Sequence, residues 1–586
     1  MNRDIRSFLK DNILLFDGAM GTYLAAKDRA LRNEVELANL TAPEKILDIH
    51  EEYLEAGATA ITTNTFGANR QNYPDNWERI IDEGFRLASE AASKHDAYVF
   101  SDIGPMEFED TANPAEEYKK IAERFLKNGA RHFIFETQSM SDGILEAAEF
   151  IRSVNNQAFI IASFAVMPDG FTKDGEFASK LAKTIGSCPY IDAFGLNCMQ
   201  DALHMKDLVK PLRYGDKYLC LMPNAGYPTV LGRRVFYKGD PAFFARNVAE
   251  LALCGAGILG GCCGTTPDHI RLLKQALPAK VQANPTITNK EEQIRDTVIS
   301  PFWESLKDRQ KKTIAVELDP PENASLDKFM DGSRRLQKAG VDAITVADCP
   351  IGRARMDSSL LSCKLKRELD MDVLPHLTCR DRNLNATKAL LLGLYAEKVR
   401  NVLLVTGDPV PSAQRDEVRS VYQFNSRKLA SFVDELGKQV LGGGFHIFGA
   451  LNVNARNFDV QLKLAQQKID NGMKGFLTQP ILSENALKNL EKARETLDAY
   501  ILGGLIPIVS ERNARYMDRE VNGMTVDPQI IRAYEGKDRA QAEALAVEIT
   551  TKTAKDMKDL VDGYYLITPF SRISLMERII GQIQAL

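Results

Sequence analysis

The sequence lacks any long run of positive charge and any long run of apolar residues. Its 74 Lys and Arg against 79 Asp and Glu give a net charge of −5, and no basic block is long enough to follow a phosphate backbone. The most apolar stretch, 251–263, is far shorter than the roughly 20 residues that span a bilayer. The first residues also lack the apolar core of a signal peptide. We therefore expect no nucleic-acid or membrane partner and a cytoplasmic location.

Cysteine is scarce, with nine residues among 586. An odd count argues against complete pairing, and a disulfide framework is excluded for so long a chain, so we expect reduced thiols. Hydrophobic residues make up 44% and charged residues 26%, which is typical of a soluble globular protein. The length is about twice what one hydrophobic core organises, which predicts two or three domains.

Short β-branched or aromatic runs alternate with helical stretches along the whole chain, which indicates βα units and parallel strands. Two sets of eight strands are predicted, near 14–18, 60–66, 98–104, 132–138, 159–166, 193–198, 218–224 and 257–263, and then near 313–318, 343–348, 373–379, 401–408, 446–453, 475–479, 500–509 and 563–568. We predict an α/β fold of two tandem (β/α)8 TIM-type barrels, at 1–280 and 311–586, joined by a linker at 281–310 whose polar first part leads into a short helix. A doubly wound open sheet is the alternative, but it usually has fewer strands and a glycine-rich first turn.

Three cysteines end predicted strands of the first half. Cys198 ends the sixth strand, and Cys262 and Cys263 end the eighth. Strand ends of a barrel share one rim, so three thiolates there can hold Zn2+ and leave one position open, as in catalytic zinc sites. Glycines on both sides of the adjacent pair let the backbone break the alternation of a strand. The alternative is that they are buried small hydrophobes, which we favour for the other six cysteines.

A zinc ion with three thiolates suits binding a fourth thiol as a nucleophile, which indicates S-alkylation. The first half also resembles the homocysteine S-methyltransferase family. The motifs that carry the resemblance are FDGAMGT (16–22), ITTNTFGAN (61–69), FET (135–137), GLNC (195–198), PNAG (223–226) and GGCCGTTPDHI (260–270).

This resemblance implies Cys198, Cys262 and Cys263 as zinc ligands, with the homocysteine sulfur as the fourth. It also implies that Asp17 and Glu136 hold the homocysteine ammonium. The further substrate contacts that it implies are the amides of Gly18, Ala19 and Met20 for the carboxylate, with Asn224 and Asn64 at the rim.

The second half has acid, amide and hydroxyl side chains at its strand ends and no metal-ligand cluster, which suggests cofactor binding with one proton transfer. It resembles 5,10-methylenetetrahydrofolate reductase. The motifs are AVELDPP (315–321), AITVAD (343–348), PHLTC (375–379), LLVTGDP (403–409), KIDNGMKGFLTQP (468–480) and GGLIPIVS (503–510). The resemblance implies FAD, reduced by NADH or NADPH, that passes hydride to methylenetetrahydrofolate and gives 5-methyltetrahydrofolate.

The same resemblance assigns residue roles. Glu317 is the acid that helps the folate N10 amine leave, and its pKa is expected to be raised. Asp408 lies near the flavin pyrimidine edge, and Gln479 contacts folate. The remaining assignments are flavin contacts at Thr345, His376, Thr406, Gly407 and Tyr422, a diphosphate contact at Lys468 and a folate-tail contact at Arg572. The family often has arginine where this chain has Thr406.

The expected function is a bifunctional enzyme that makes methyltetrahydrofolate and methylates homocysteine to methionine. The alternative is a methyltransferase whose second barrel only senses folate or flavin. No D-x-H-x-x-G corrinoid signature occurs in the sequence. The methyl group therefore comes through a separate corrinoid protein, from another donor such as S-methylmethionine, or directly from methyltetrahydrofolate, whose tertiary amine is a poor leaving group without activation.

Overall fold

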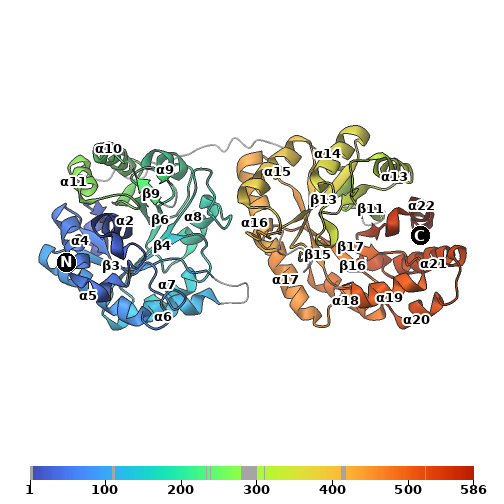
Figure 1. The fold of residues 1–586 in the computed structure, drawn as a ribbon, viewed down its shortest axis with the longest axis horizontal. Helices are drawn as coiled ribbons and strands as arrows, with labels where there is room; N and C mark the ends of the chain where they lie inside the picture. The colour runs from blue at the N-terminus through green and yellow to red at the C-terminus, as the bar shows by residue number, and fades with distance from the viewer. Residues whose placement is uncertain are drawn as a thin grey trace. The chain divides into compact units, whose positions relative to one another are not determined.

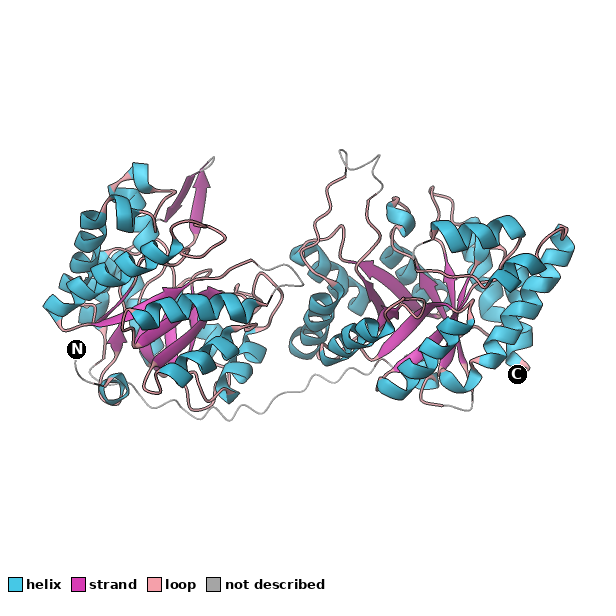
Figure 2. Ribbon diagram, turned by 90° about the horizontal axis from the view of Figure 1, so that it is seen from below, coloured by secondary structure: helices cyan, strands magenta, loops and turns pink. Residues whose placement is uncertain are grey.

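The computed structural model describes residues 4–107, 113–231, 234–237, 239–278, 298, 300–308, 311–410, 418–521 and 523–586. The chain divides into two compact units, 1–291 and 292–586. In each unit a ring of strands lies inside a layer of helices (Figures 1 and 2). None of the helices in the described ranges is both long and apolar enough to cross a lipid bilayer.

The first unit is a barrel of eight parallel strands. Around the sheet they are β1 (Leu14–Leu15), β2 (Ala60–Thr62), β3 (Tyr98–Ile103), β4 (His132–Gln138), β5 (Phe159–Phe164), β6 (Ala193–Asn197), β7 (Tyr218–Met222) and β10 (Ala256–Leu259). A parallel bridge between Phe16 and Ala60 joins the two ends of the sheet, so the barrel closes. An antiparallel hairpin of β8 (Pro228–Leu231) and β9 (Arg234–Tyr237) is inserted after β7.

The second unit is a closed barrel of eight parallel strands in sequence order. They are β11 (Thr313–Leu318), β12 (Ala343–Val346), β13 (Asp372–Thr378), β14 (Asn401–Val405), β15 (His446–Leu451), β16 (Gly475–Pro480), β17 (Tyr500–Leu505) and β18 (Gly563–Ile567). The prediction of two tandem α/β barrels is confirmed.

Helices follow the strands and cover both barrels. In the first they are α1 (Ile5–Leu9), α2 (Met20–Lys27), α3 (Ala38–Thr41), α4 (Pro43–Glu55), α5 (Trp77–His95), α6 (Pro114–Lys127), α7 (Ile144–Val154), α8 (Ala178–Ser187), α9 (Ala202–Val209), α10 (Pro241–Ala252) and α11 (Pro267–Ala276). In the second they are α12 (Pro301–Ser305), α13 (Asp327–Lys338), α14 (Ser358–Leu369), α15 (Leu384–Ala396), α16 (Ser426–Leu436), α17 (Phe458–Asp470), α18 (Glu484–Thr496), α19 (Glu511–Glu520), α20 (Pro528–Ala533), α21 (Arg539–Asp556) and α22 (Ile573–Gln584).

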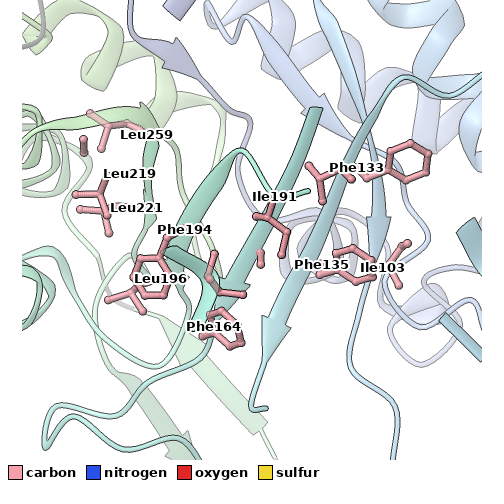
Figure 3. Packing of buried hydrophobic residues seen from close by; sticks show 14 of the residues in the cluster. Ile103, Phe133, Phe135, Phe164, Ile191, Phe194, Leu196, Leu219, Leu221 and Leu259 are labelled. Atoms are coloured by element: carbon pink, nitrogen blue, oxygen red, sulfur yellow. The ribbon is translucent and has the colours of Figure 1, made fainter. Parts of the chain in front are cut away.

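Strand β5 shows why continuous apolar runs form these barrels. All six residues of its sequence FIIASF are buried. Phe159 and Ile161 belong to the cluster inside the barrel, whereas Ile160, Ala162 and Phe164 belong to the cluster under the helices. Figure 3 shows this outer cluster, with Phe133, Phe164 and Leu221 among its members. Both faces of a parallel strand are therefore apolar, as expected when helices cover the sheet.

A short helix closes the amino-terminal end of each barrel. In the second barrel, Phe302 and Trp303 of α12 pack with the inward-facing strand residues. The Trp303 ring stacks on His446, the first residue of β15, with ring centroids 4.3 Å apart. Asp372 Oδ2 accepts hydrogen bonds from the Ser300 hydroxyl and the Phe302 amide, both at 2.8 Å. The range predicted as a linker, 281–310, thus includes a segment that packs into the second barrel.

We predict that Phe302→Ala lowers the free energy of unfolding of the second barrel by about 3–5 kcal/mol, because a fully buried phenyl ring leaves a cavity. Denaturant unfolding of the whole chain, followed by signals from both barrels, measures the effect. Phe570→Ala is the matched control: Phe570 is 72% exposed, so its loss should change the free energy by less than about 0.5 kcal/mol. Equal effects of the two variants would contradict the packing role of α12.

Candidate active sites

Polar side chains occupy the inward-facing positions at the carboxyl ends of the strands in the first barrel. Side chains two residues apart on a strand share a face. Phe100, Ile134 and Ile161 lie in the inner apolar cluster, so Asp102, Glu136 and Ser163 face the same interior one level higher. Apolar packing below and polar groups above define a candidate site at this rim.

Three thiols meet at this rim. Cys198 follows β6, and its Sγ lies 3.8 Å from Cys263 Sγ. All three sulfur atoms, including that of Cys262, lie within 4.8 Å of one another. Tetrahedral zinc with Zn–S bonds of about 2.3 Å requires sulfur atoms about 3.8 Å apart. The thiol spacing therefore fits one zinc ion.

The loop that carries two of these cysteines differs in detail from the prediction. Strand β10 ends at Leu259, so Cys262 and Cys263 lie beyond the strand rather than at its end. A Cβ at Gly260 would lie 2.7 Å from Phe16 Cβ, and one at Gly261 would lie 2.6 Å from Thr265 Oγ1. The two glycines therefore let the backbone pass close to Phe16 and Thr265. The chain leaves the hydrogen-bonded strand pairing before it reaches the cysteines.

Hydrogen bonds among the thiols already favour negative charge at one sulfur. Bonds from the Cys262 and Cys263 thiols lower the pKa of Cys198 to about 3. The bond with Cys198 contributes most to raising the pKa of Cys263, to about 12. The hydroxyl of Tyr237, on β9, also contacts Cys263, and burial raises the pKa of this tyrosine.

Three interacting carboxyl groups lie at this rim, and one of them, Glu136, is 3.9 Å from Cys262 Sγ. Asp17 Oδ2 accepts a hydrogen bond of 3.0 Å from the Thr62 amide. Burial and then the Glu136 charge raise the pKa of Asp102, and burial and then the Cys198 charge raise the pKa of Glu136 to about 7. Burial likewise raises the pKa of Asp17 well above its usual range. A cation between them would relieve this unfavourable crowding. The sequence analysis missed Asp102, whose signal was its place at the end of a predicted strand.

The remaining residues predicted around this pocket are Gly18, Ala19, Met20, Asn224 and Asn64. Ala19, the N-cap of α2, donates its amide to Thr265 Oγ1 at 3.0 Å, between the amides of Gly18 and Met20. Asn224 is buried, and its Oδ1 has no hydrogen-bond partner among the described residues. Asn64 donates to Val35 O at 2.7 Å and to Asn39 Oδ1 at 2.9 Å, so it braces a neighbouring loop.

The second barrel repeats the pattern with other chemistry. Ala315, Ala343 and Leu374 lie in its inner apolar cluster, so Glu317, Thr345 and His376 face the interior one level higher. Strands β11, β12 and β13 thus bring together three of the predicted site residues. Gln479, near the end of β16, occupies the equivalent level above the buried Leu477.

Glu317 is held by Tyr565, a residue that the sequence analysis missed. Tyr565 is paired with Ala315 across the sheet, and its hydroxyl donates to Glu317 Oε2. His376 Nε2 lies 3.6 Å from the same oxygen. Burial raises the pKa of Glu317 to about 7, although the Tyr565 hydroxyl acts in the opposite direction. Burial lowers the pKa of His376 to about 4, so this imidazole is neutral at pH 7.

Two buried polar atoms of this rim have no hydrogen-bond partner among the described residues: Thr345 Oγ1 and His376 Nε2. Orphaned buried polar atoms cost free energy unless a ligand or water satisfies them. They therefore fit a polar ring system such as that of a flavin.

The turn after β14 carries Thr406, Gly407 and Asp408. Gly407 has φ +93°, and a Cβ there would lie 3.0 Å from Thr378 Cβ, so glycine is required. Arg380 is only 2% exposed and donates from Nη1 to the Asp408 carbonyl at 2.9 Å. Sequence analysis missed this arginine, which orders the turn from the loop that follows β13.

The three remaining predicted contacts are Lys468, Arg572 and Tyr422. Lys468 Nζ donates to the Ala450 carbonyl at 3.0 Å, and burial lowers its pKa. Arg572 forms an ion pair of 2.9 Å with Glu543. Tyr422 is 41% exposed with φ +40°; the preceding residues 411–417 of its loop lie outside the described ranges.

Two family models match the chain: Homocysteine S-methyltransferase over residues 14–277 and Methylenetetrahydrofolate reductase over residues 303–582. Methionine synthase of Mycobacterium tuberculosis is 29% identical over an alignment of 302 residues that covers 47% of this chain and 25% of that protein. Methionine synthase of Mycobacterium leprae is 28% identical over 305 residues, with the same two shares. The chain thus covers about a quarter of the length of these relatives.

Among solved structures, the oxidised form of the homocysteine methyltransferase MmuM from Escherichia coli aligns with a TM-score of 0.39 and 23% identity. The alignment covers 47% of this chain and 99% of that one. The family matches account for the two barrels separately: the chain contains a homocysteine S-methyltransferase domain at residues 14–277 and a methylenetetrahydrofolate reductase domain at residues 303–582.

Proposed function

We propose that the second barrel reduces 5,10-methylenetetrahydrofolate to 5-methyltetrahydrofolate through FAD, and that the first methylates homocysteine to methionine at a zinc site. The observation that carries the proposal is the convergence of three thiols at one barrel rim, with Cys198 and Cys263 sulfurs 3.8 Å apart. The product of the second barrel contains the methyl group that the first consumes, which gives the fusion a chemical reason.

In the first barrel, Cys198, Cys262 and Cys263 would hold Zn2+, which supplies a positive charge that keeps the homocysteine sulfur deprotonated. Asp17 and Glu136 bind the substrate ammonium, since Glu136 lies 3.9 Å from Cys262 Sγ, Asp17 is close enough for the two charges to interact, and both lack a cationic partner among the described residues. The amides of Gly18 and Met20 receive the carboxylate, because Ala19 is already engaged and the first amides of a helix have no partner within it. The Asn224 side chain forms a polar part of the wall of this substrate pocket.

In the second barrel, FAD reduced by NADH or NADPH would supply hydride. Thr345, His376, Thr406, Gly407, Asp408, Tyr422 and Lys468 are the proposed cofactor contacts, and Gln479 and Arg572 the proposed folate contacts. Glu317 gives its proton to the folate N10 amine as the five-membered ring opens, and the resulting iminium carbon accepts the hydride. A carboxyl whose pKa is about 7 can be protonated at neutral pH and so can act as this acid.

The methyl donor to homocysteine is either methyltetrahydrofolate itself, a separate corrinoid protein, or another methylated compound such as S-methylmethionine. Methionine formation from each donor, with and without an added corrinoid protein, distinguishes the three. Direct transfer requires a proton on the folate amine, because a neutral tertiary amine releases its methyl group poorly.

We expect Cys262→Ala to lose bound zinc and methyl transfer together, because two thiolates no longer complete the site. Zinc content by metal analysis and methionine formation are measured on the same preparation. Cys254→Ala, at a partly exposed cysteine outside the cluster, is the matched control and should retain both. Full zinc content in the Cys262 variant would contradict the site.

We expect Glu317→Gln to lower folate reduction by about 10²–10⁴-fold while flavin stays bound and is still reduced by NADH or NADPH, because only the proton donor is lost. Glu322→Gln is the control, since Glu322 is a mostly exposed carboxylate on the loop that follows β11. Steady-state folate reduction and flavin bleaching give the two rates. A wild-type chain that binds folate or flavin without turnover would support a sensing module instead.

Folate reduction should fall as pH rises through about 7, since Glu317 must be protonated. Tyr565→Phe removes a hydrogen bond that stabilises the ionised carboxylate and lowers its pKa, so the pKa rises further and the alkaline limb moves to higher pH. The pH profile of kcat/KM for the folate measures this shift. Tyr564→Phe is the control, because its hydroxyl donates to Ala554 O instead. A Tyr565 variant whose limb moves to lower pH would refute the assignment.

A further inference from the structure

Asn197, the last residue of β6, is fully buried between the carboxyl and thiol groups of the first barrel. It stands two residues above Gly195 on the inward-facing side of the strand. Its carboxamide contacts groups from three other strands or their ends, including Glu136 and Cys262.

The oxygen of this carboxamide supports the backbone. Asn197 Oδ1 accepts hydrogen bonds from the Thr137 amide at 3.0 Å and from the Ser163 hydroxyl at 2.6 Å. Thr137 has φ +56°, a left-handed conformation that is unfavourable for a β-branched residue. The bond to its amide therefore stabilises a strained residue next to Glu136.

The nitrogen of the same carboxamide faces the reacting groups. Asn197 Nδ2 donates to Glu136 Oε1 at 3.1 Å, to Thr137 Oγ1 at 2.7 Å and to Cys262 Sγ at 3.8 Å. A reversed amide would place Oδ1 against the Glu136 carboxylate and Nδ2 against the Thr137 amide, which repel. The orientation is thus fixed by the network, and every polar atom of the side chain is engaged.

We propose that Asn197 is a positioning residue that fixes Glu136 relative to Cys262, so that the ammonium and the sulfur of one homocysteine molecule are held at once. This inference rests on the proposed methyl-transfer function. Glu136 Oε1 and Cys262 Sγ lie only 3.9 Å apart, and a carboxylate and a zinc thiolate repel when they are this close. N–H groups donated to both anions offset that repulsion and hold the spacing, which must match the three carbons between the amine and the sulfur of the substrate.

The test compares Asn197→Ala with wild type in the whole chain. Zinc affinity is measured by chelator competition without substrate, and it should fall about 10–100-fold because a residue supporting the ligands is lost. At saturating zinc, the preference for homocysteine over 4-mercaptobutanoate, which lacks the amino group, should fall about tenfold because Glu136 is no longer positioned. A purely structural role would lower stability without changing this preference.

Asn128→Ala is the matched control, because it removes a carboxamide of the same barrel that donates to Asp82 Oδ1 and the Arg124 carbonyl instead. It should keep wild-type zinc affinity and preference. Should Asn197→Ala fail to fold, Asn197→Ser keeps a polar side chain too short to reach both Glu136 and Cys262, and the same two losses are expected. If the variant that folds has wild-type zinc affinity and wild-type preference for homocysteine, only this inference is overturned. If the wild-type chain binds neither zinc nor homocysteine, the proposed function is overturned as well.

Discussion

The two-residue period of a parallel strand is the constraint on which both sites depend. Within each barrel, inward-facing side chains form an apolar level that closes the interior, as Ala315, Ala343 and Leu374 do in the second barrel. The next inward-facing position on the same strands is then a rim position, enclosed by protein below and open above. Glu317 and Glu136 occupy such positions, and their chemistry follows from this half-enclosed environment.

Burial acts in the same direction on both carboxyl groups. It raises the pKa of Glu136 and of Glu317 to about 7, because ionisation in a low-dielectric interior is costly. The groups beside each carboxyl determine what chemistry its raised pKa can serve. Glu317 has a tyrosine hydroxyl and a neutral histidine beside it, which suits a group that transfers a proton. Glu136 lies among thiols and two further acids, which suits a group that binds a cation.

Most of the fold could be predicted from the sequence because strand and helix periodicity is local. The site residues at strand ends, such as Cys198 and Glu317, were also predictable, since a barrel brings all these ends to one rim. Tyr565 and Asn197 were not, because each acts through a contact with a residue on another strand, and nothing local distinguishes a tyrosine within GYYLI as the partner of an acid 248 positions away. A short helix at the end of the linker was predicted, but the packing of α12 into the second barrel was not, because its short apolar segment shows this role only once the barrel interior exists.

Separate barrels have a consequence for how the two activities depend on each other. The metal cluster and its supporting network draw all their described residues from the first unit, and the Glu317 network draws all of its from the second. No described side chain is shared between the two sites. In the function that we propose, the product of the second barrel carries a methyl group, the kind of group that the first barrel transfers, so the two activities can depend on each other through that product.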